Sequence, residues 1–316
     1  MISRSTVAAV TSQTGGWYTL KQSTQIRVKA QTQQRFRQFA RILPEFGPHM
    51  GPVYQFPKLY NLSSAGQEIS EFGDIPVAGW STGYGQCTTK LYSNSIQLSQ
   101  EADIFSELSV VDASLLALLN EANSTLDKVA AYKFRTCELV YTPTGTMSSK
   151  SYVLSNNGTA AAAATRNMTM WDLRRISHLM RTTYKMPYWS DNMFVGIIPP
   201  SVQLSIREDN EYHDLMKHYK PEMQLRGELA PVEDFRLVGE NNVLDDNLNS
   251  GTCGECVFFG RDPMVGIELE PFELQAANLD PYGRFRAIRW LWRGGYERTW
   301  DYAADTEARI LRVGSL

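Results

Sequence analysis

The feature that most constrains the fold is one long apolar periodicity. Starting at Ser109, apolar residues recur every three or four positions over about 27 residues, which predicts an amphipathic helix. The recurring positions are Val111, Leu115, Leu118, Ala122, Leu126 and Val129. Ser109 to Asp112 forms a start similar to a capping box, and neither Gly nor Pro follows before Pro143. Such a helix spans about 40 Å. In a chain that also contains strands, it acts as a spine against which a sheet packs.

Length and composition narrow the class of protein. A chain of 316 residues exceeds the size at which one hydrophobic core usually stops growing, so we expect two lobes. No apolar run approaches the roughly 20 residues that span a bilayer, and no secretory signal is expected behind the first residues. The four cysteines are too few for a disulfide scaffold, so a reducing compartment is expected.

Charge is unevenly distributed along the chain. Residues 1–44 carry no Asp or Glu, and the remainder of the chain carries a net charge of −10 against −3 for the whole. The seven basic residues of this segment are Arg4, Lys21, Arg27, Lys29, Arg35, Arg37 and Arg41. Its richness in Gln, Ser and Thr predicts an extended arm that orders against a partner. That partner is either nucleic acid, whose counterions Lys and Arg displace, or the acidic surface of neighbouring subunits.

Two strand-like segments, 53–60 and 88–98, predict a long hairpin. Between them, residues 63–86 are rich in Gly and form a long loop, which is usually functional. The expected tip, residues 72–80, exposes apolar side chains, and exposed apolar tips indicate a partner surface. The candidate contact residues there are Phe72, Ile75, Val77 and Trp80. The alternative is that Phe72 and Trp80 fold back on the core.

The remaining pattern alternates helices and strands. A helix capped by Thr169 ends before Pro187, and residues 201–219 read as another helix. The expected strands are 139–141, 152–154, 194–198, 235–238, 256–259, 265–269, 285–292 and 308–313. No fixed-period repeat is visible.

Catalytic motifs are scarce. Cys253 and Cys256, with His213 and His218, offer two Cys and two His ligands for zinc, but their spacing and order fit no common finger. Two buried, inert cysteines are the simpler interpretation. The acidic turn at residues 245–251 lacks the Glu that a calcium loop requires at its twelfth position, because Cys256 stands there. The sequence contains none of the common nucleophile, zinc-protease, phosphate-loop or dinucleotide motifs.

Four stretches, taken in order, resemble one family. They are residues 92–98 through 125–130, Met168–Arg174 with Val195–Pro200, Phe259–Pro263, and Asp280–Gly283 with Gly294–Tyr296. Their order and spacing resemble the major capsid proteins of tailed bacteriophages, in the phage N-four-like family with the Hong Kong 97 fold. The resemblance covers about residues 50–316 and matches the arm only in character.

The resemblance implies an α+β capsid fold of five parts: an N-terminal arm at 1–50, an extended hairpin loop at 51–100, a peripheral domain with the spine helix at 101–164, an axial domain at 165–275, and return strands of the peripheral domain at 276–316. It also implies a structural protein of the virion, assembled in the bacterial cytoplasm, with neither enzymatic activity nor a cofactor, metal or membrane association.

Its implied partners are other copies of itself, in hexamers and pentamers, and packaged double-stranded DNA. A portal and a scaffold or decoration protein are also expected. The tip residues and the basic residues Arg27, Lys29, Arg35, Arg37 and Arg41 are then candidate inter-subunit contacts. Two other functions stay open: a metal-dependent enzyme using the Cys and His pairs, and a sequence-independent nucleic-acid-binding protein using the arm.

Overall fold

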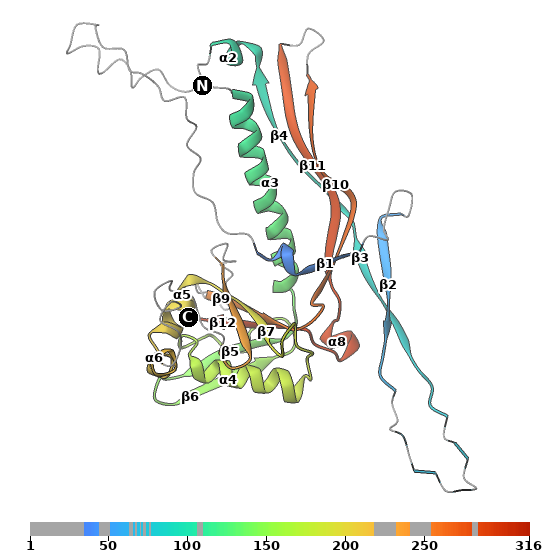
Figure 1. Cartoon of the computed structure of the whole chain (residues 1–316), viewed down its shortest axis with the longest axis vertical. Helices are drawn as coiled ribbons and strands as arrows, with labels where there is room; N and C mark the ends of the chain where they lie inside the picture. The colour runs from blue at the N-terminus through green and yellow to red at the C-terminus, as the bar shows by residue number, and fades with distance from the viewer. Residues whose placement is uncertain are drawn as a thin grey trace, which may run out of the picture.

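The computed structural model describes residues 35–43, 51–62, 81–105, 110–217, 232–240, 254–279 and 284–316 (Figure 1). It also describes residues 66, 68, 69, 71, 74, 75 and 77–80 of the loop between residues 62 and 81. The chain forms an elongated layer of sheet and helix, a lobe built on a second sheet, and a hairpin that projects away from both (Figure 1). This mixed architecture confirms the predicted α+β class.

The elongated layer contains a four-stranded sheet in the order β1-β10-β11-β4. These strands are Ala40–Leu43, Met264–Asn278, Phe285–Arg298 and Lys90–Ser99. Strand β11 pairs antiparallel with both β10 and β4, whereas β1 pairs parallel with β10. Helix α2 (Gln100–Phe105) follows β4, and helix α3 (Val110–Arg135) runs along one face of the sheet (Figure 1).

Helix α3 is the spine predicted from the apolar periodicity. Leu118, Ala122 and Leu126 are fully buried, and they share a core cluster with Trp290 and Trp292 of β11. Alternate residues of β11 point to the same face of the sheet, so both indole rings lie against the helix. Each indole N–H also has an acceptor: that of Trp290 donates to Glu121 at 2.5 Å, and that of Trp292 to Glu268 at 3.3 Å.

The lobe is built on a six-stranded sheet in the order β6-β5-β12-β9-β7-β8. In chain order these strands are β5 (Val140–Gly145), β6 (Lys150–Ser155), β7 (Phe194–Ile198), β8 (Phe235–Gly239), β9 (Gly254–Phe259) and β12 (Ile310–Ser315). The helices of the lobe are α4 (Met170–His178), its π-helical continuation η3 (Leu179–Thr183), α5 (Pro200–Arg207) and α6 (Asn210–Met216). Among the described helices, none is long and apolar enough to cross a bilayer.

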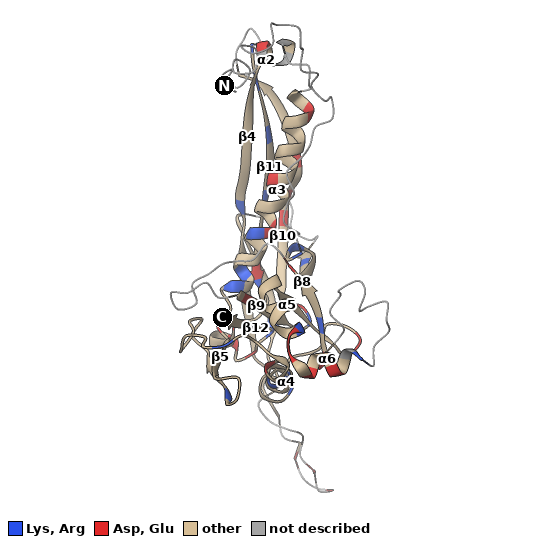
Figure 2. Ribbon diagram, turned by 90° about the vertical axis from the view of Figure 1, so that its left-hand side faces the viewer, with Lys and Arg blue, Asp and Glu red and all other residues tan. Residues whose placement is uncertain are grey.

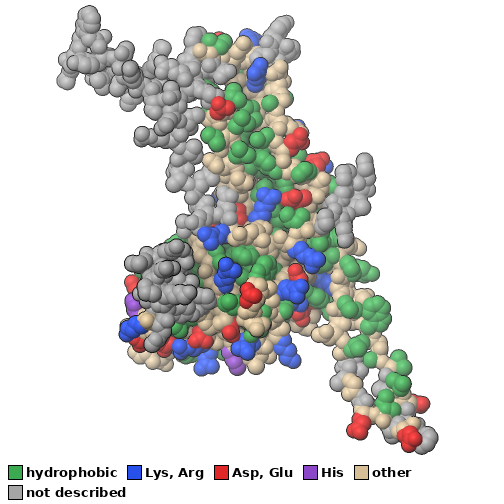
Figure 3. Space-filling model, in the orientation of Figure 1, with side chains coloured by type: hydrophobic (Ala, Val, Ile, Leu, Met, Phe, Trp, Pro, Cys, Tyr) green, Lys and Arg blue, Asp and Glu red, His purple; other side chains and the backbone are tan. Residues whose placement is uncertain are grey.

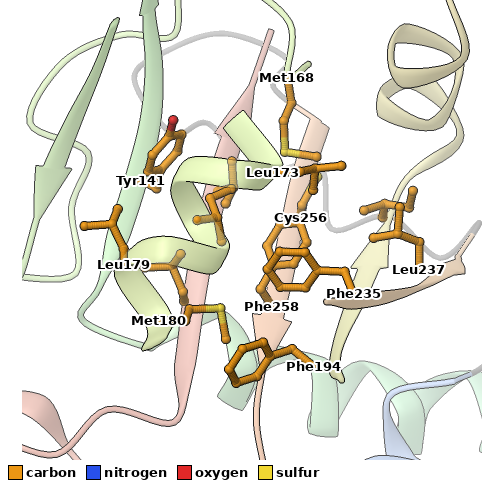
Figure 4. Packing of buried hydrophobic residues seen from close by; sticks show 14 of the residues in the cluster. Tyr141, Met168, Leu173, Leu179, Met180, Phe194, Phe235, Leu237, Cys256 and Phe258 are labelled. Carbon is orange, nitrogen blue, oxygen red and sulfur yellow. The ribbon is translucent and has the colours of Figure 1, made fainter. Parts of the chain in front are cut away.

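The core of the lobe lies between α4 and the sheet. Leu173, Leu179 and Met180 of the helical segment share this core with Phe235 and Phe258 of the strands, and Figure 4 shows Met180 pointing toward Phe194. Thr169 precedes the helix as predicted, and its backbone N–H donates to the carboxylate of Asp172 at 2.9 Å. Burying a Leu, Met or Phe side chain contributes about 1.5–3 kcal/mol to folding stability, so the apolar face of α4 holds the helix against the sheet.

One predicted strand pairing is wrong. The partner of β2 (Val53–Leu59) is β3 (Thr82–Thr88), whereas the segment predicted as the returning strand, 88–98, is β4 of the other sheet. Two of the glycines that suggested a loop, Gly83 and Gly85, are strand residues in β3. A Cβ atom at Gly85 would lie 2.1 Å from the ring of Phe56, so only Gly leaves room for that ring to cover the strand.

Three other element boundaries also differ from prediction. The predicted helix 201–219 is two helices, because Asp209 adopts an extended conformation and its carboxylate accepts the N–H of Glu211 at the start of α6. Strand β10 continues beyond Leu269 to Asn278, and the register shifts between Glu268 and Glu273 accommodate Pro271. Residues 40–43, assigned to the arm, form strand β1 at the edge of the chain's own sheet.

The chain passes between the elongated layer and the lobe three times within the described residues. The connections are 136–139, 260–263 and 299–309, the last containing helix α8 (Tyr302–Asp305). At the first of them Glu255 of β9 lies 3.2 Å from Arg135 at the end of α3 and 3.0 Å from Arg312 of β12. All three side chains are largely buried, so a charge network joins the spine helix to the lobe.

Candidate interaction surfaces

The projecting hairpin consists of β2 and β3, which pair with each other in a sheet of two strands. A hairpin of two strands is marginally stable alone, so something must hold it to the body. Burial alternates along both strands, and the inward side chains of β2 are Phe56 and Lys58. At the base, Cys87 of β3 is fully buried in a small cluster with Ile267 of β10.

A buried polar clasp fixes the base of this hairpin. The ammonium of Lys58 donates to Asp305 of α8 at 2.5 Å, and the hydroxyl of Tyr60 donates to the same carboxylate at 2.6 Å. Only 8% of the Lys58 side chain and 4% of the Asp305 side chain are exposed. The indole of Trp300 adds a cation–π contact at 5.4 Å from the ammonium.

Two opposed effects set the pKa of Asp305. Burial raises the pKa of a carboxyl group, because it disfavours the charged form, but the hydrogen bonds from Lys58 and Tyr60 outweigh it. The pKa of Asp305 is therefore lowered from its ordinary value of 3.8. The carboxylate stays ionised at neutral pH, and the clasp is closed.

Beyond the clasp the hairpin exposes apolar side chains. Val77 is 96% exposed, Trp80 is 72% exposed, and Ile75 and Leu62 are also exposed. Figure 3 shows hydrophobic side chains along the projecting hairpin, clear of the body. Trp80 therefore does not fold back on the core. Phe72, the fourth predicted tip residue, lies outside the described residues.

The predicted basic contact residues lie in different environments. Arg27 and Lys29 lie outside the described part of the chain, and Arg35 is partly buried at its start. Arg41 is largely exposed, with its guanidinium 3.8 Å from Asp262. Arg37 is bound within its own subunit. Its backbone N–H donates to the buried Asp127 of α3 at 3.0 Å, and its guanidinium donates to Glu268 of β10 at 2.8 Å.

Two of the four predicted zinc ligands, Cys253 and His218, lie outside the described residues. Cys256 is buried in the core of the lobe, and burial raises the pKa of its thiol well above the ordinary value. His213 is exposed on α6. A buried thiol that keeps its proton is a poor metal ligand. Within the described ranges, no three His, Cys, Asp or Glu side chains gather in a group able to hold a metal.

Sequence reasoning missed the clasp. The only local signal was a lone Lys58 on the same face of a strand as Phe56 and Tyr60. Its partner Asp305 lies 247 positions away in the sequence, and no sequence pattern indicates that the two residues pair.

No protein-family model matches the chain, and no curated protein matches it in sequence. Solved structures do match it over nearly its whole length. The cyanophage Pam1 capsid gives a TM-score of 0.73 at 12% identity, with 96% of this chain and 98% of that chain covered. The acidic stable capsid of Helicobacter pylori bacteriophage KHP30 gives 0.72 at 11% identity, with 96% and 97% covered.

The capsid of Ralstonia phage GP4 matches with a TM-score of 0.68 at 13% identity, with 95% of each chain covered. The chain has a Hong Kong 97-like capsid fold. This confirms the fold expected from the four sequence stretches, with its long helix and its projecting hairpin. In this fold the exposed tip of the hairpin is a surface that its own subunit leaves open to a partner.

Proposed function

We propose that the protein is the major capsid protein of a tailed phage, and that it assembles into the hexamers and pentamers of an icosahedral head. The observation that carries the proposal is the match of the whole chain to capsid subunits, with almost complete coverage of both chains. An apolar hairpin tip that has no cover within its own subunit adds support. On this proposal the role is structural rather than enzymatic.

The parts of the capsid fold are assigned by sheet rather than by position in the sequence. The four-stranded sheet with α3 is the peripheral domain, the six-stranded lobe is the axial domain, and β2–β3 is the extended loop. This assignment moves β4 and β10 to the peripheral domain and β5, β6 and β12 to the axial domain. The boundaries expected from the sequence group these strands differently.

Contacts between subunits are proposed at the hairpin tip and the arm. The proposed contact residues are Phe72, Ile75, Val77, Trp80, Arg27, Lys29, Arg35 and Arg41. Arg37 also remains a proposed contact residue, although its guanidinium pairs with Glu268 within the subunit. The shell would enclose double-stranded DNA and contact a portal and a scaffold or decoration protein. Its location would be the virion, after assembly in the host cytoplasm.

The test is the size of the assembled species. The full chain is expressed, its sedimentation is measured over a range of concentrations, and the fast fraction is imaged by electron microscopy. Closed shells, or rings of five or six subunits, are expected. A species that stays monomeric or dimeric at every concentration, including after addition of a crowding polymer, would contradict the proposal.

A further inference from the structure

Two of the three connections between the elongated layer and the lobe meet at the start of helix α8 (Figure 1). The backbone N–H of Ala303 has two carboxyl acceptors: Glu138 of the first connection at 2.5 Å and Asp301 of the third at 3.2 Å. Because both accept the same N–H, the two carboxyl groups lie close together, and a side-chain hydrogen bond joins them. A hydrogen bond between two carboxyl groups requires a proton on one of them. A single proton therefore decides whether this contact holds.

The surroundings of the pair are polar but contain little solvent. A cavity of about 10 Å³, with room for about one water molecule, lies beside Glu138. The charged, phenolic and indole side chains that line it are Glu138, Arg298, Trp300, Tyr302, Glu307 and Arg309. Arg298 lies 3.1 Å from Asp301, whereas Arg309 is paired with Glu307 at 2.8 Å. Figure 2 shows charged residues of both signs gathered where α3 meets the lobe. Arg298 is thus the cation that acts directly on the carboxyl pair.

Opposed effects set the charge of Glu138. Burial disfavours its ionised form, and the neighbouring Asp301 adds to this, whereas the N–H of Ala303 and the guanidinium of Arg298 favour the carboxylate. The first two effects outweigh the others, so the pKa of Glu138 is raised from its ordinary value of 4.5. Glu138 therefore keeps its proton in mild acid and loses it as the pH rises.

We propose that Glu138 and Asp301 form a proton-dependent latch between the first and third connections. In mild acid the protonated carboxyl group of Glu138 donates a hydrogen bond to the carboxylate of Asp301, and this bond holds the start of α8 against the first connection. When the proton is lost, two carboxylates face each other across one N–H, and their repulsion loosens the start of α8. The latch lies within one subunit, so the inference does not depend on the proposed capsid function.

The other end of α8 keeps its attachment in both states of the latch. The carboxylate of Asp305 accepts hydrogen bonds from Lys58 at 2.5 Å and from Tyr60 at 2.6 Å. Because the pKa of Asp305 is lowered from 3.8, this carboxylate stays ionised over the pH range in which Glu138 loses its proton. The latch therefore changes how firmly α8 is joined to the first connection without releasing the hairpin.

The pH dependence of local protection tests the latch. A carboxyl group with a raised pKa stabilises the fold fully below its ordinary value, here 4.5, and the stabilisation is lost as the pH rises through the folded-state value. The reporters are the amides of Asp305 and Thr306, which close the turn of α8 onto Asp301 and Tyr302. Their protection factors, measured by hydrogen exchange on the full chain and corrected for intrinsic exchange, should fall by about threefold to tenfold between about pH 5 and about pH 8, as expected for a half-exposed charge interaction. The amides of β2 and β3 should not follow this change.

Two substitutions separate the proton from the shape of the side chain. Glu138→Gln keeps a donor for Asp301 and an acceptor for Ala303 but cannot titrate. It should remove the pH dependence and leave the protection at the level of the wild-type chain in mild acid. The matched control is Glu307→Gln, which changes a carboxyl group that lines the same cavity but is paired with Arg309. This control should keep the wild-type profile.

The wild-type chain alone can overturn the proposal, so the test does not require any variant to fold. A flat protection profile for Asp305 and Thr306 would show that the carboxyl pair holds no proton. A profile that persists in Glu138→Gln would show that another group titrates. Either result contradicts the latch, whereas a profile present in the wild-type and Glu307→Gln chains and absent from Glu138→Gln supports it.

Discussion

The clasp at the base of the hairpin can be opened by one substitution. Asp305→Asn keeps the shape of the side chain but removes its charge, leaving the ammonium of Lys58 buried without a counter-charge. Removing one partner of a buried ion pair costs about 3–5 kcal/mol, and the contact of Lys58 with the indole of Trp300, present with and without the substitution, does not change this cost. The cost falls on the attachment of β2 and β3 rather than on the two core clusters.

Hydrogen exchange measures this cost locally. A destabilisation of this size should speed the exchange of the hairpin amides by roughly 150-fold to 5,000-fold, because exchange follows the free energy of local opening. The amides of α3 and of the six-stranded sheet should exchange at their wild-type rates. Electron microscopy of the same variant should show fewer closed shells, since a loose hairpin is no longer held in its preorganised position.

A matched variant separates charge from shape. Lys58→Met combined with Asp305→Asn removes both charges and keeps the volume, so hairpin exchange should return to within about threefold of wild type. The reasoning would be refuted if the single variant exchanged at the wild-type rate. It would also be refuted if the double variant were as loose as the single one.

Three further outcomes are expected. Because the pKa of Asp305 lies below 3.8, the stabilisation by the clasp is complete well above that pH and is lost as the pH falls through the lower folded-state value; the protection factors of the hairpin amides, which correct for the pH dependence of intrinsic exchange, should thus be constant from neutral pH to about pH 5 and fall only in stronger acid. Leu118→Asp should lower the free energy of unfolding by at least about 4 kcal/mol in denaturant melts, whereas Leu116→Asp, on the exposed side of α3, should cost under about 1 kcal/mol. Deleting residues 68–80 should leave the melting temperature unchanged and abolish shells; normal shells would rule out the tip as a contact.

Local patterns predicted the spine helix well. The buried face that contains Leu118, Ala122 and Leu126 appears in the sequence as apolar residues every three or four positions, and the whole helix lies within one continuous segment. The order of the later strands was also predicted, as was the cap at Thr169. These features depend on neighbours in the sequence, so a single sequence contains them.

Pairings between distant residues were not predictable in the same way. The glycines Gly83 and Gly85 indicate a loop when read alone, and become strand residues only beneath the rings of Tyr60 and Phe56. The basic arm suggested contacts outside the subunit, yet Arg37 is bound to Asp127 and Glu268 of its own chain.

The three passages of the chain between the elongated layer and the lobe have a mechanical consequence. A lobe joined by one linker can swing freely, whereas a lobe held by three connections can only flex slightly. Beside the first connection, the ion pairs of Glu255 with Arg135 and Arg312 restrain the lobe further. Load applied to the lobe is therefore transmitted to the long sheet almost undiminished. Any large change in the curvature of an assembly would have to be taken up at the seams between subunits and at the root of the hairpin.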